Sequence, residues 1–500
     1  MASDEKPHDD LLKRFQKHGA AWRYLSNNYA NASKTLDRYI NLIQRFHSEF
    51  SCKPHTILRA PGRVNLLGGH TDYNGCPVIP IAIDRDILAA ISARNDSQIV
   101  LTNTEPRFER RSFQIAHQIE PYLTGDWGNY IKAAVQGMVT HFEGQNRDQR
   151  LNNGFNMAVS GNIPHAAGMS SSSALVVLSA LAFLYTNSVH IDKLELAQLL
   201  AKAEWYVGTQ GGGMDQTISL LGQADHALKI EFNPYSIMPV VLPRDYQYIV
   251  THSLVYAPKT ESALNKYNQR PIECRLAVAL IKNHVQKKFN REFDIRLIGD
   301  LTRQKLGLSD EQIYGLCLEA LPEKSYSYSS LSVILRKTIN EIQQSYCLKR
   351  DGTVFDEPED GFKLRSRFIH IFTEWKRVLM AVELLKGGDV LELGHLMNEA
   401  QISCRENYEI SVPEIDKLVE LSLTHGAIGA RLTGAGFGGC VVNLVPEKKV
   451  PYFIERIGKK YYQKFARKLL PPDRAWQDFI FVCKSVDGAG EAIFWKYLNV

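Results

Sequence analysis

The chain has 500 residues, of which 44% are hydrophobic and 23% are charged. This composition excludes disordered and fibrous proteins, and the length predicts two domains or more, because single cores usually stop growing near ~250–300 residues. The 59 basic and 54 acidic residues leave a net charge of +5 without a basic block, so no nucleic-acid or anionic-membrane partner is predicted.

Apolar runs and cysteines indicate the compartment. The longest apolar stretch, ALVVLSALAFLY at 174–185, is shorter than the ~20 residues of a membrane-spanning helix. The N-terminal MASDEKPHDD is polar, unlike a signal peptide. The cysteines form no CxxC pair and have no histidine at zinc-finger spacing. We therefore expect a cytoplasmic protein with reduced cysteines and no membrane partner.

In chain order, residues 11–50 carry apolar residues at helical spacing and predict one or two amphipathic helices. From Thr56 onwards, β-branched runs separated by glycine and proline predict strands: ILRAPGRVNLLGG, CPVIPIAI and DILAAISA. Residues 166–221 alternate glycine- or serine-rich turns with helical stretches, and the strand-like HALKIEF follows. Residues 349–360 indicate a surface loop or a small strand pair, and residues 365–386 are again helical.

These segments predict three parts. A helical extension covers residues 1–50, a first lobe covers 51–232 and a second lobe covers 233–500. The boundary between the lobes is expected at the turn Asn233–Pro234, to within several residues.

The first of four candidate site motifs is RAPGRVNLLGGHTDYNG, at 59–75. It places Arg63, His70 and Asp72 among glycines, so that polar side chains stand where the backbone turns sharply. An ordinary strand–loop–strand connection with solvated polar tips is the alternative.

The second motif, PHAAGMSSSSA at 164–174, leads directly into a helical run. Small residues and hydroxyls at a helix start collect free backbone N–H groups, the positive helix end and serine oxygens around one point. This combination binds phosphate oxygens and Mg²⁺. A serine-rich helix cap without a ligand is the alternative, and no GxxxxGK[ST] is present, which excludes an ordinary P-loop.

The third motif is GTQGGGMDQ, at 208–216, in which Asp215 follows three glycines. An acid beside bare backbone can approach a substrate hydroxyl closely, as a general base or an orienting group must. Glu204, eleven residues earlier, faces a plausible metal position. For both acids the alternative is an ordinary turn residue.

The fourth motif, TGAGFGG at 433–439, satisfies GxGxxG formally through Gly434, Gly436 and Gly439. A dinucleotide-binding loop opens a helix, whereas here the β-branched run CVVNLV follows. The motif is therefore interpreted as a second glycine-rich wall that closes on a site.

Taken in this order, the four motifs resemble those of the GHMP sugar and metabolite kinases, specifically their galactokinase branch. APGRVNLLGGHTDYNG looks like the galactokinase signature, PHAAGMSSSSALVV like the family's phosphate loop and LTGAGFGGC like its third glycine motif. The resemblance implies an α+β fold of two lobes with the active site in the cleft between them. It also implies transfer of the γ-phosphoryl group of ATP to the anomeric hydroxyl of galactose or a close relative.

Position by position, the resemblance implies that Arg63 and Asp215 are catalytic. It implies that Gly69, His70, Asp72 and Tyr267 face the sugar, and that Ser172 and Glu204 hold Mg²⁺. The ATP-binding residues it implies are Trp127, Gly168, Ser170, Ser171, Ser172, Gly434 and Gly436. Tyr130 accompanies Trp127 near the adenine pocket, where a core aromatic pair is the alternative.

Position 69 departs from the family. Galactokinases carry GEHTDYN, whereas this chain has GGHTDYN, so the carboxylate that accepts a hydrogen bond from the sugar's C6 hydroxyl is missing. The loss of one such contact costs ~0.5–3 kcal/mol. Either water fills the space and galactose is a poorer substrate, or the substrate lacks or oxidises C6, as L-arabinose and D-galacturonate do.

The phosphate loop departs as well, with His165–Ala167 in place of a glycine-rich run. The four serines and GTQGGGMDQ resemble the N-acetylgalactosamine kinase and plant-type branch, while Tyr267 favours galactose. Two other function classes stay open: a catalytically weak regulator that binds sugar and ATP, and a homoserine- or mevalonate-type kinase, which HTDYNG opposes.

Overall fold

A six-stranded sheet in the order β12-β1-β2-β5-β3-β4 forms the centre of the first lobe. The computed structural model describes residues 19–144, 151–164, 167–208, 211–256, 261–349 and 352–492. The strands are β1 (Thr56–Leu67), β2 (Ile79–Ala93), β3 (Gln98–Asn103), β4 (Arg111–Gln114), β5 (Phe155–Gly161) and β12 (Gly490–Glu491). β1 and β2 pair antiparallel and are buried almost throughout, because apolar side chains pack on both of their faces.

β2 is one strand where the sequence predicted two runs. The runs CPVIPIAI and DILAAISA are separated in the sequence by Asp84 and Arg85, yet β2 continues through both, and the carboxylates of Asp84 and Asp86 are buried inside the strand. Asp86 accepts hydrogen bonds from Arg59 Nε at 2.6 Å and from Tyr29 Oη at 2.6 Å, and it pairs with Arg38. Partners from distant segments therefore satisfy a charge in the interior of the strand.

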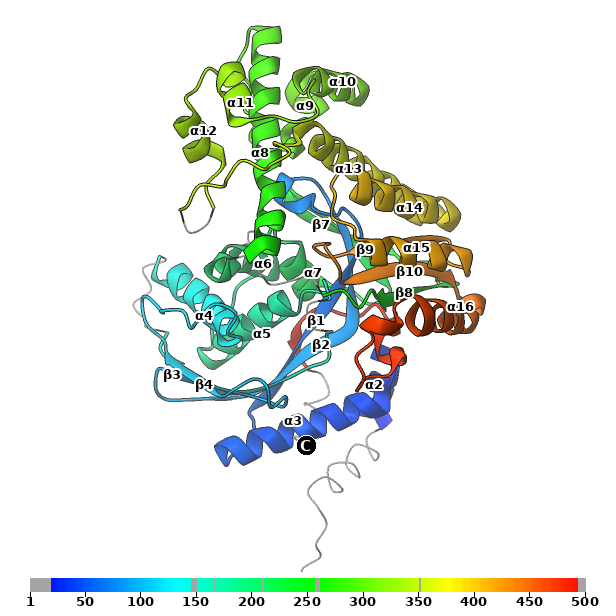
Figure 1. The fold of residues 1–500 in the computed structure, drawn as a ribbon. Coiled ribbons are helices and arrows are strands. Elements are labelled where there is room, and N and C mark those ends of the chain that lie inside the picture. The colour runs from blue at the N-terminus through cyan, green and yellow to red at the C-terminus, as the bar shows by residue number, and fades with distance from the viewer. Residues whose placement is uncertain are drawn as a thin grey trace, which may run out of the picture.

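Helices cover both faces of this sheet (Figure 1). On one face lie α4 (Gly128–Glu143), α5 (Ser171–Thr186), α6 (Lys193–Ala203) and α7 (Met214–Leu221). On the other face α3 (Ala32–Phe50) packs its apolar side against β2 and β5, with α2 (Gly19–Asn28) before it. The predicted N-terminal helices are thus confirmed for residues 19–50, and residues 11–18 lie outside the described part.

The second lobe has a four-stranded antiparallel sheet in the order β11-β8-β10-β9. Its strands are β8 (Tyr246–His252), β9 (Gly429–Thr433), β10 (Cys440–Pro446) and β11 (Ile480–Cys483). The strand β10 follows the fourth glycine motif directly, which confirms that this motif does not open a helix. Three helices pack against the sheet: α14 (Val390–Glu406), α15 (Pro413–Thr424) and α16 (Val450–Ile457).

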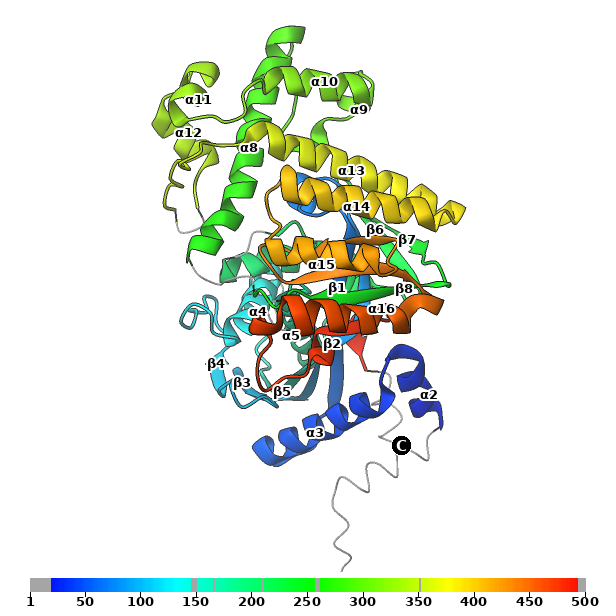
Figure 2. The same cartoon turned by 45° about the vertical axis from the view of Figure 1, so that its right-hand side comes forward.

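The remaining helices extend the second lobe away from α3 (Figures 1 and 2). They are α8 (Glu261–Phe289), α9 (Arg303–Leu306), α10 (Asp310–Ala320), α11 (Tyr328–Leu335), α12 (Ile339–Tyr346) and α13 (Leu364–Gly387). The helix predicted at 365–386 is confirmed as α13, which lies beside α14. In the described part of 349–360 no helix forms, and Val354 forms an isolated bridge with Leu348.

The hairpin β6 (His226–Phe232) and β7 (Tyr235–Val241) connects the two lobes. The expected boundary, Asn233–Pro234, lies in its turn, and the hairpin packs on both β2 and α13. The division after residue 232 therefore stays a prediction.

The two lobes share one hydrophobic core. It contains Val64 and Leu66 of β1 together with Val250, Val442 and Leu444 of the second sheet. The loops at the ends of β1 and β9 consequently meet where the lobes pack. No helix within the described ranges has the length and apolar content that crossing a membrane requires.

Candidate functional site

A cavity of about 730 Å³ lies where the four sequence motifs meet. Every residue that the sequence predicted for the site lines it: Arg63, Gly69, His70, Asp72, Trp127, Gly168, Ser170, Ser171, Ser172, Glu204, Asp215, Tyr267, Gly434 and Gly436. These residues lie in or next to β1, η1 (Asp72–Asn74), α4, α5, η2 (Glu204–Val207), α7 and α8, and in the loop after β9. The fold thus brings together segments that lie up to several hundred positions apart in the chain.

Arg63 and Asp215 form the centre of the cavity. The guanidinium donates from Nε to Asp215 Oδ1 at 2.6 Å and from Nη2 to Oδ2 at 2.8 Å. This two-bonded geometry fixes both side chains in one plane. Ser170 Oγ also donates to Asp215, so a hydroxyl, a carboxylate and a guanidinium converge on one point.

Arg63 stands beside an irregularity in the pairing of β1 and β2. Between the pairs Pro61–Asp86 and Arg63–Ala82, β2 has more residues than β1, so the register shifts directly before Arg63 and the extra residues belong to β2. A β-carbon on Gly62 would lie 2.9 Å from the carbonyl oxygen of Met169. Only glycine therefore lets β1 approach the phosphate loop so closely.

The phosphate loop ends at the first turn of α5. Gly168 and Ser170 have φ values of 72° and 57°, and Ser170 is the N-cap residue of α5 without a capping side-chain bond. The free N–H groups and the positive end of α5 therefore face the cavity, an arrangement that binds phosphate. The predicted departure at His165 and Ala166 lies outside the described residues.

The fourth motif touches this loop backbone to backbone. A β-carbon on Gly168 would lie 2.8 Å from Thr433 O, and one on Gly434 would lie 2.6 Å from Gly168 Cα. Side chains at either position would separate the two loops. The fourth motif therefore forms the wall of the cavity opposite the loop at 164–174, and its interpretation as a second glycine-rich wall is consistent with this contact.

Glu204 follows α6 and is buried beside the start of α5. Its Oε2 accepts from Ser173 Oγ at 2.8 Å and from Gln216 Nε2. Burial raises the pKa of Glu204 to about 7, because the ionised carboxylate loses its hydration in the protein interior. Within the described residues, no group of three or more His, Cys, Asp or Glu side chains is placed to hold a metal ion.

Asp72 and Tyr267 lie at the other end of the cavity. Asp72 begins the short helix η1, and its Oδ2 accepts from the backbone N–H of Gly212 at 3.0 Å. Burial, and then the negative charge of Asp215, raise the pKa of Asp72 to about 6. Tyr267 of α8 faces this region, with its ring 5.8 Å from the ring of His70.

His70 bonds to the protein through both ring nitrogens. Nε2 lies 3.1 Å from Ala435 O and Nδ1 lies 2.9 Å from Tyr73 Oη. Burial lowers the pKa of His70 to about 3, so the ring is neutral. The imidazole lines the cavity, but a hydrogen bond to a ligand would have to replace one of these two bonds.

The space beside Gly69 is occupied by protein. A β-carbon there would lie 2.8 Å from Arg431 Nη2, so a side chain at this position would have to displace the Arg431 guanidinium. Glu374 Oε1 accepts from the N–H groups of Gly68 and Gly69 at 2.9 and 3.0 Å. Glu374 also pairs with Arg431 at 2.6 Å and with Arg377 at 2.8 Å.

Burial alone would raise the pKa of Glu374, but Arg431 and then Arg377 outweigh it and hold the pKa well below its usual value. The carboxylate is therefore ionised, and it fixes the backbone of the first motif from α13 in the other lobe. Sequence reasoning missed Glu374 and Arg431. In the sequence these two residues differ from ordinary positions only in that they are charged and stand within mainly apolar stretches, IFTEWKRVL and GARLTG.

Aromatic side chains form the far end of the cavity. Trp127 and Tyr130 line it, together with Arg107 and Phe108 from the loop after β3. The rings of Phe108 and Trp127 are 5.9 Å apart, and Trp127 Nε1 donates to Glu109 O at 3.0 Å. These side chains could stack on a planar heterocycle. Arg107 and Phe108 were not predicted, because TEPRFERR resembles any charged surface loop.

Three segments match family models. Residues 44–93 match the galactokinase galactose-binding signature, residues 129–223 match the GHMP kinases N terminal domain and residues 381–464 match GHMP kinases C terminal. The first match contains Arg63 and the Gly69–Asp72 loop, the second contains the phosphate loop, Glu204 and Asp215, and the third contains the fourth glycine motif.

Whole-chain relatives agree with these matches. Galactokinase of Dictyostelium discoideum is 36% identical over 469 residues, with 88% of this chain and 91% of the relative covered. Galactokinase of Saccharomyces cerevisiae is 32% identical over 463 residues, with 81% and 85% covered. The crystal structure of Lactococcus lactis galactokinase complexed with galactose superposes with a TM-score of 0.70 at 25% identity, covering 91% of this chain and all of that one.

Proposed function

Since the chain belongs to the galactokinase family and is an ATP-dependent sugar 1-kinase of galactokinase type, we propose that its sugar is galactose. We also propose that Arg63 and Asp215 act at the reacting hydroxyl. The observation that carries the proposal is the Arg63–Asp215 pair, which lies between the phosphate loop and the Asp72–Tyr267 end of one cavity. The two-lobed α+β fold is that of the GHMP kinases.

In the transfer, the anomeric oxygen of the sugar forms a bond to the γ-phosphorus while the bond from that phosphorus to the β–γ bridging oxygen breaks. Asp215 is proposed to orient the anomeric hydroxyl and to accept its proton. Arg63 neutralises charge on the transferring group, and the N–H groups at the start of α5 hold the remaining phosphate oxygens. No bond between enzyme and phosphate is needed, since positioning and charge neutralisation suffice.

We propose that Mg²⁺ binds with ATP between Ser172 and Glu204. The donors fit, because Mg²⁺ is usually held by one or two carboxylates together with substrate phosphates and water. Glu204 is a buried carboxylate at the head of α5 that forms no ion pair with a described residue, so a cation would compensate its charge. When bound, the ion would neutralise charge on the phosphates.

Glu204→Gln is therefore expected to raise the Mg²⁺ concentration that gives half-maximal rate by about tenfold or more, since one charged ligand is lost. The initial rate is measured against free Mg²⁺ at fixed ATP and sugar. Glu195→Gln, an exposed change on α6, the helix that precedes Glu204, is the matched control. An unchanged Mg²⁺ requirement in Glu204→Gln would contradict the assignment.

A substrate panel tests the identity of the sugar. The purified full-length protein is assayed for ADP release with galactose, N-acetylgalactosamine, L-arabinose and D-galacturonate. We expect the highest kcat/KM with galactose, with the product phosphorylated at C1. A higher value with another sugar would replace galactose as the substrate and leave the roles of Arg63 and Asp215 in place.

A sugar with a carboxylate at C6 is the second candidate. Arg431 and Arg377 face the single carboxylate of Glu374 beside Gly69, which leaves one net positive charge near the position where the family has glutamate. A buried cation favours a nearby anion. D-galacturonate supplies one, and its kcat/KM relative to galactose decides between the two sugars.

The pKa of Asp72 predicts a pH dependence. As a carboxylate, Asp72 can accept hydrogen bonds from two sugar hydroxyls, whereas the protonated form must donate one proton. Because its pKa is raised to about 6, we expect the sugar KM to rise as the pH falls through about 6, at saturating ATP and Mg²⁺. Asp72→Asn should show a high KM that does not change between pH 5 and 8. A pH-independent KM in the unmodified protein would refute this role.

A further inference from the structure

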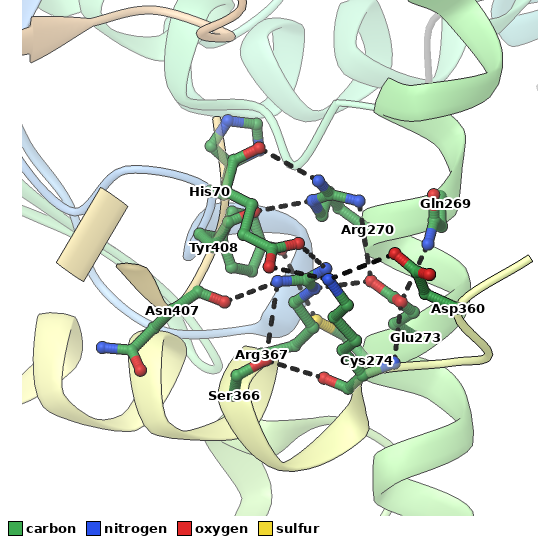
Figure 3. Close-up of polar contacts among 12 residues, drawn as sticks. His70, Gln269, Arg270, Glu273, Cys274, Asp360, Ser366, Arg367, Asn407 and Tyr408 are labelled. Atoms are coloured by element: carbon green, nitrogen blue, oxygen red, sulfur yellow. Dashed lines mark hydrogen bonds and ion pairs between the residues drawn. The ribbon is translucent and has the colours of Figure 1, made fainter. Parts of the chain in front are cut away.

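The turn Asn407–Glu409, directly after α14, is held by an unusual set of buried charges (Figure 3). Arg367 Nη1 donates to Asn407 O at 2.6 Å. Arg270 donates from Nε to Tyr408 O at 2.7 Å and from Nη2 to Glu409 O at 3.0 Å. Two guanidinium groups thus bind three consecutive carbonyl oxygens of one turn.

The guanidinium groups are themselves fixed. Arg367 Nε pairs with Glu273 of α8 at 2.6 Å, and Nη2 pairs with Glu409 at 2.8 Å. Arg367 and Glu273 are fully buried, and Glu409 has a φ of 54°, which costs energy for a residue other than glycine. Buried ion pairs seldom add net stability. Their presence here, around a strained turn, indicates a need for one defined position rather than for stability.

The side chain that this turn positions is Tyr408. Its ring stacks on His370 at 4.3 Å with an interplanar angle of 29°, and lies 5.1 Å from the ring of His70. His370 Nε2 lies 3.0 Å from Gly69 O. Tyr408 Oη lies 2.8 Å from Tyr73 Oη, which in turn bonds to His70 Nδ1. Tyr408 is fully buried and does not line the cavity.

The hydrogen bonds of this group have one direction. A carbonyl oxygen only accepts, so His70 Nε2 carries the proton that is donated to Ala435 O. In the neutral ring Nδ1 is then an acceptor, and the Tyr73 hydroxyl must donate to it. The oxygen of Tyr73 is in turn free to accept from Tyr408. Each group therefore donates to the next in the order Tyr408, Tyr73, His70 and Ala435. The chain of hydrogen bonds runs from the second lobe to the first motif and back to the fourth motif.

We propose that Tyr408 is a positioning residue of the sugar site: its hydroxyl fixes the ring of His70 through Tyr73, and its ring supports His370 against the backbone of Gly69. The inference rests on the proposed function in one respect, that the Gly69–Asp72 loop binds the sugar. In this proposal the buried charges around Asn407–Glu409 have a role, because they hold Tyr408 where it contacts both His70 and His370.

Single and double variants test the proposal in the full-length enzyme with the best sugar of the panel. Tyr408→Phe keeps the ring and removes the hydroxyl. It should raise the sugar KM by about 3- to 10-fold, the effect of one buried hydrogen bond, while kcat and the KM for ATP stay within about twofold. Tyr73→Phe should raise the sugar KM at least as much. The double variant should match Tyr73→Phe alone, because both changes act through one chain of bonds.

Tyr328→Phe is the matched control, because it removes another buried hydroxyl of the second lobe, which donates to Phe355 O at 2.6 Å. A loss of thermal stability without a change in sugar KM, in both Tyr408→Phe and Tyr328→Phe, would overturn the proposal. So would additive effects of Tyr73→Phe and Tyr408→Phe, or an effect on the KM for ATP.

A second measurement does not depend on the sugar. Nitrogen-15 spectra of histidine-labelled protein should show His70 as the neutral Nε2–H tautomer with a hydrogen-bonded Nδ1. Tyr73→Phe and Tyr408→Phe should both shift the Nδ1 signal toward that of an unbonded nitrogen. If no sugar is phosphorylated, the proposed function fails. The Nδ1 signal of His70 then still decides this inference, and an unchanged signal in Tyr408→Phe would refute it.

Discussion

Asp215→Asn is expected to lower the kcat of sugar phosphorylation by about 10²- to 10⁴-fold, the usual range for the loss of a group that takes up the reacting proton. The amide has the size of the carboxylate, so it can still face Arg63 and Ser170. It cannot accept the hydroxyl proton or form an ion pair with the guanidinium. The reacting hydroxyl therefore loses its base while the cavity keeps its shape.

Steady-state rates and ATP binding by calorimetry check this result together. The dissociation constant for ATP should stay within about threefold, because the loop and helix end that hold the phosphates are intact. Asp473→Asn, at an exposed position in the same chain, controls for the general effect of removing a carboxylate. A kcat near that of the unmodified enzyme would show that another group takes the proton.

Arg63→Ala is expected to lower kcat by about 10²- to 10³-fold, as the loss of a donor to developing charge usually does. Sugar KM should change much less, because the contact with the transferring group strengthens as the reaction proceeds. The alanine also leaves Asp215 without its ion pair and removes the bond to Gly168 O. Loss of rate and a shift of the phosphate loop are thus expected together.

Arg63→Lys separates charge from geometry. Lysine keeps the positive charge but cannot make the two bonds to Asp215, so it should recover only part of the rate. Thermal unfolding of both variants measures how much of the effect is structural. A large increase in sugar KM at unchanged kcat would place Arg63 in ground-state binding instead.

The site could be predicted where a motif holds its chemistry within a few residues. Arg63, Asp72 and Asp215 each stand beside glycines, and the serines stand at a helix start, so the local sequence indicates both the residue and its purpose. Their convergence in one cavity is a property of the fold. The resemblance to a family implied this convergence, whereas no spacing along the chain does.

The residues that support the site were not predictable in this way. Glu374 and Tyr408 lie within ordinary helical or turn sequences, and their contacts with Gly69 and Tyr73 span more than 300 residues. Hydrogen bonds of buried groups depend on tertiary packing. The same limit applies to β2, which continues through Asp86 because Arg59 and Tyr29, from other segments of the chain, satisfy its buried charge.

The strand β12 determines when the first lobe can be completed during synthesis. It pairs with β1 through Leu58 and Arg59, on the edge opposite β2. A ribosome makes Arg63 and the phosphate loop early, but β1 keeps an open edge until residues 490–491 have emerged. Open strand edges invite pairing with other chains. Until then Leu58 and Arg59 lie on an open edge of the strand that also carries Arg63, and the segment that covers this edge stands 435 residues away in the chain.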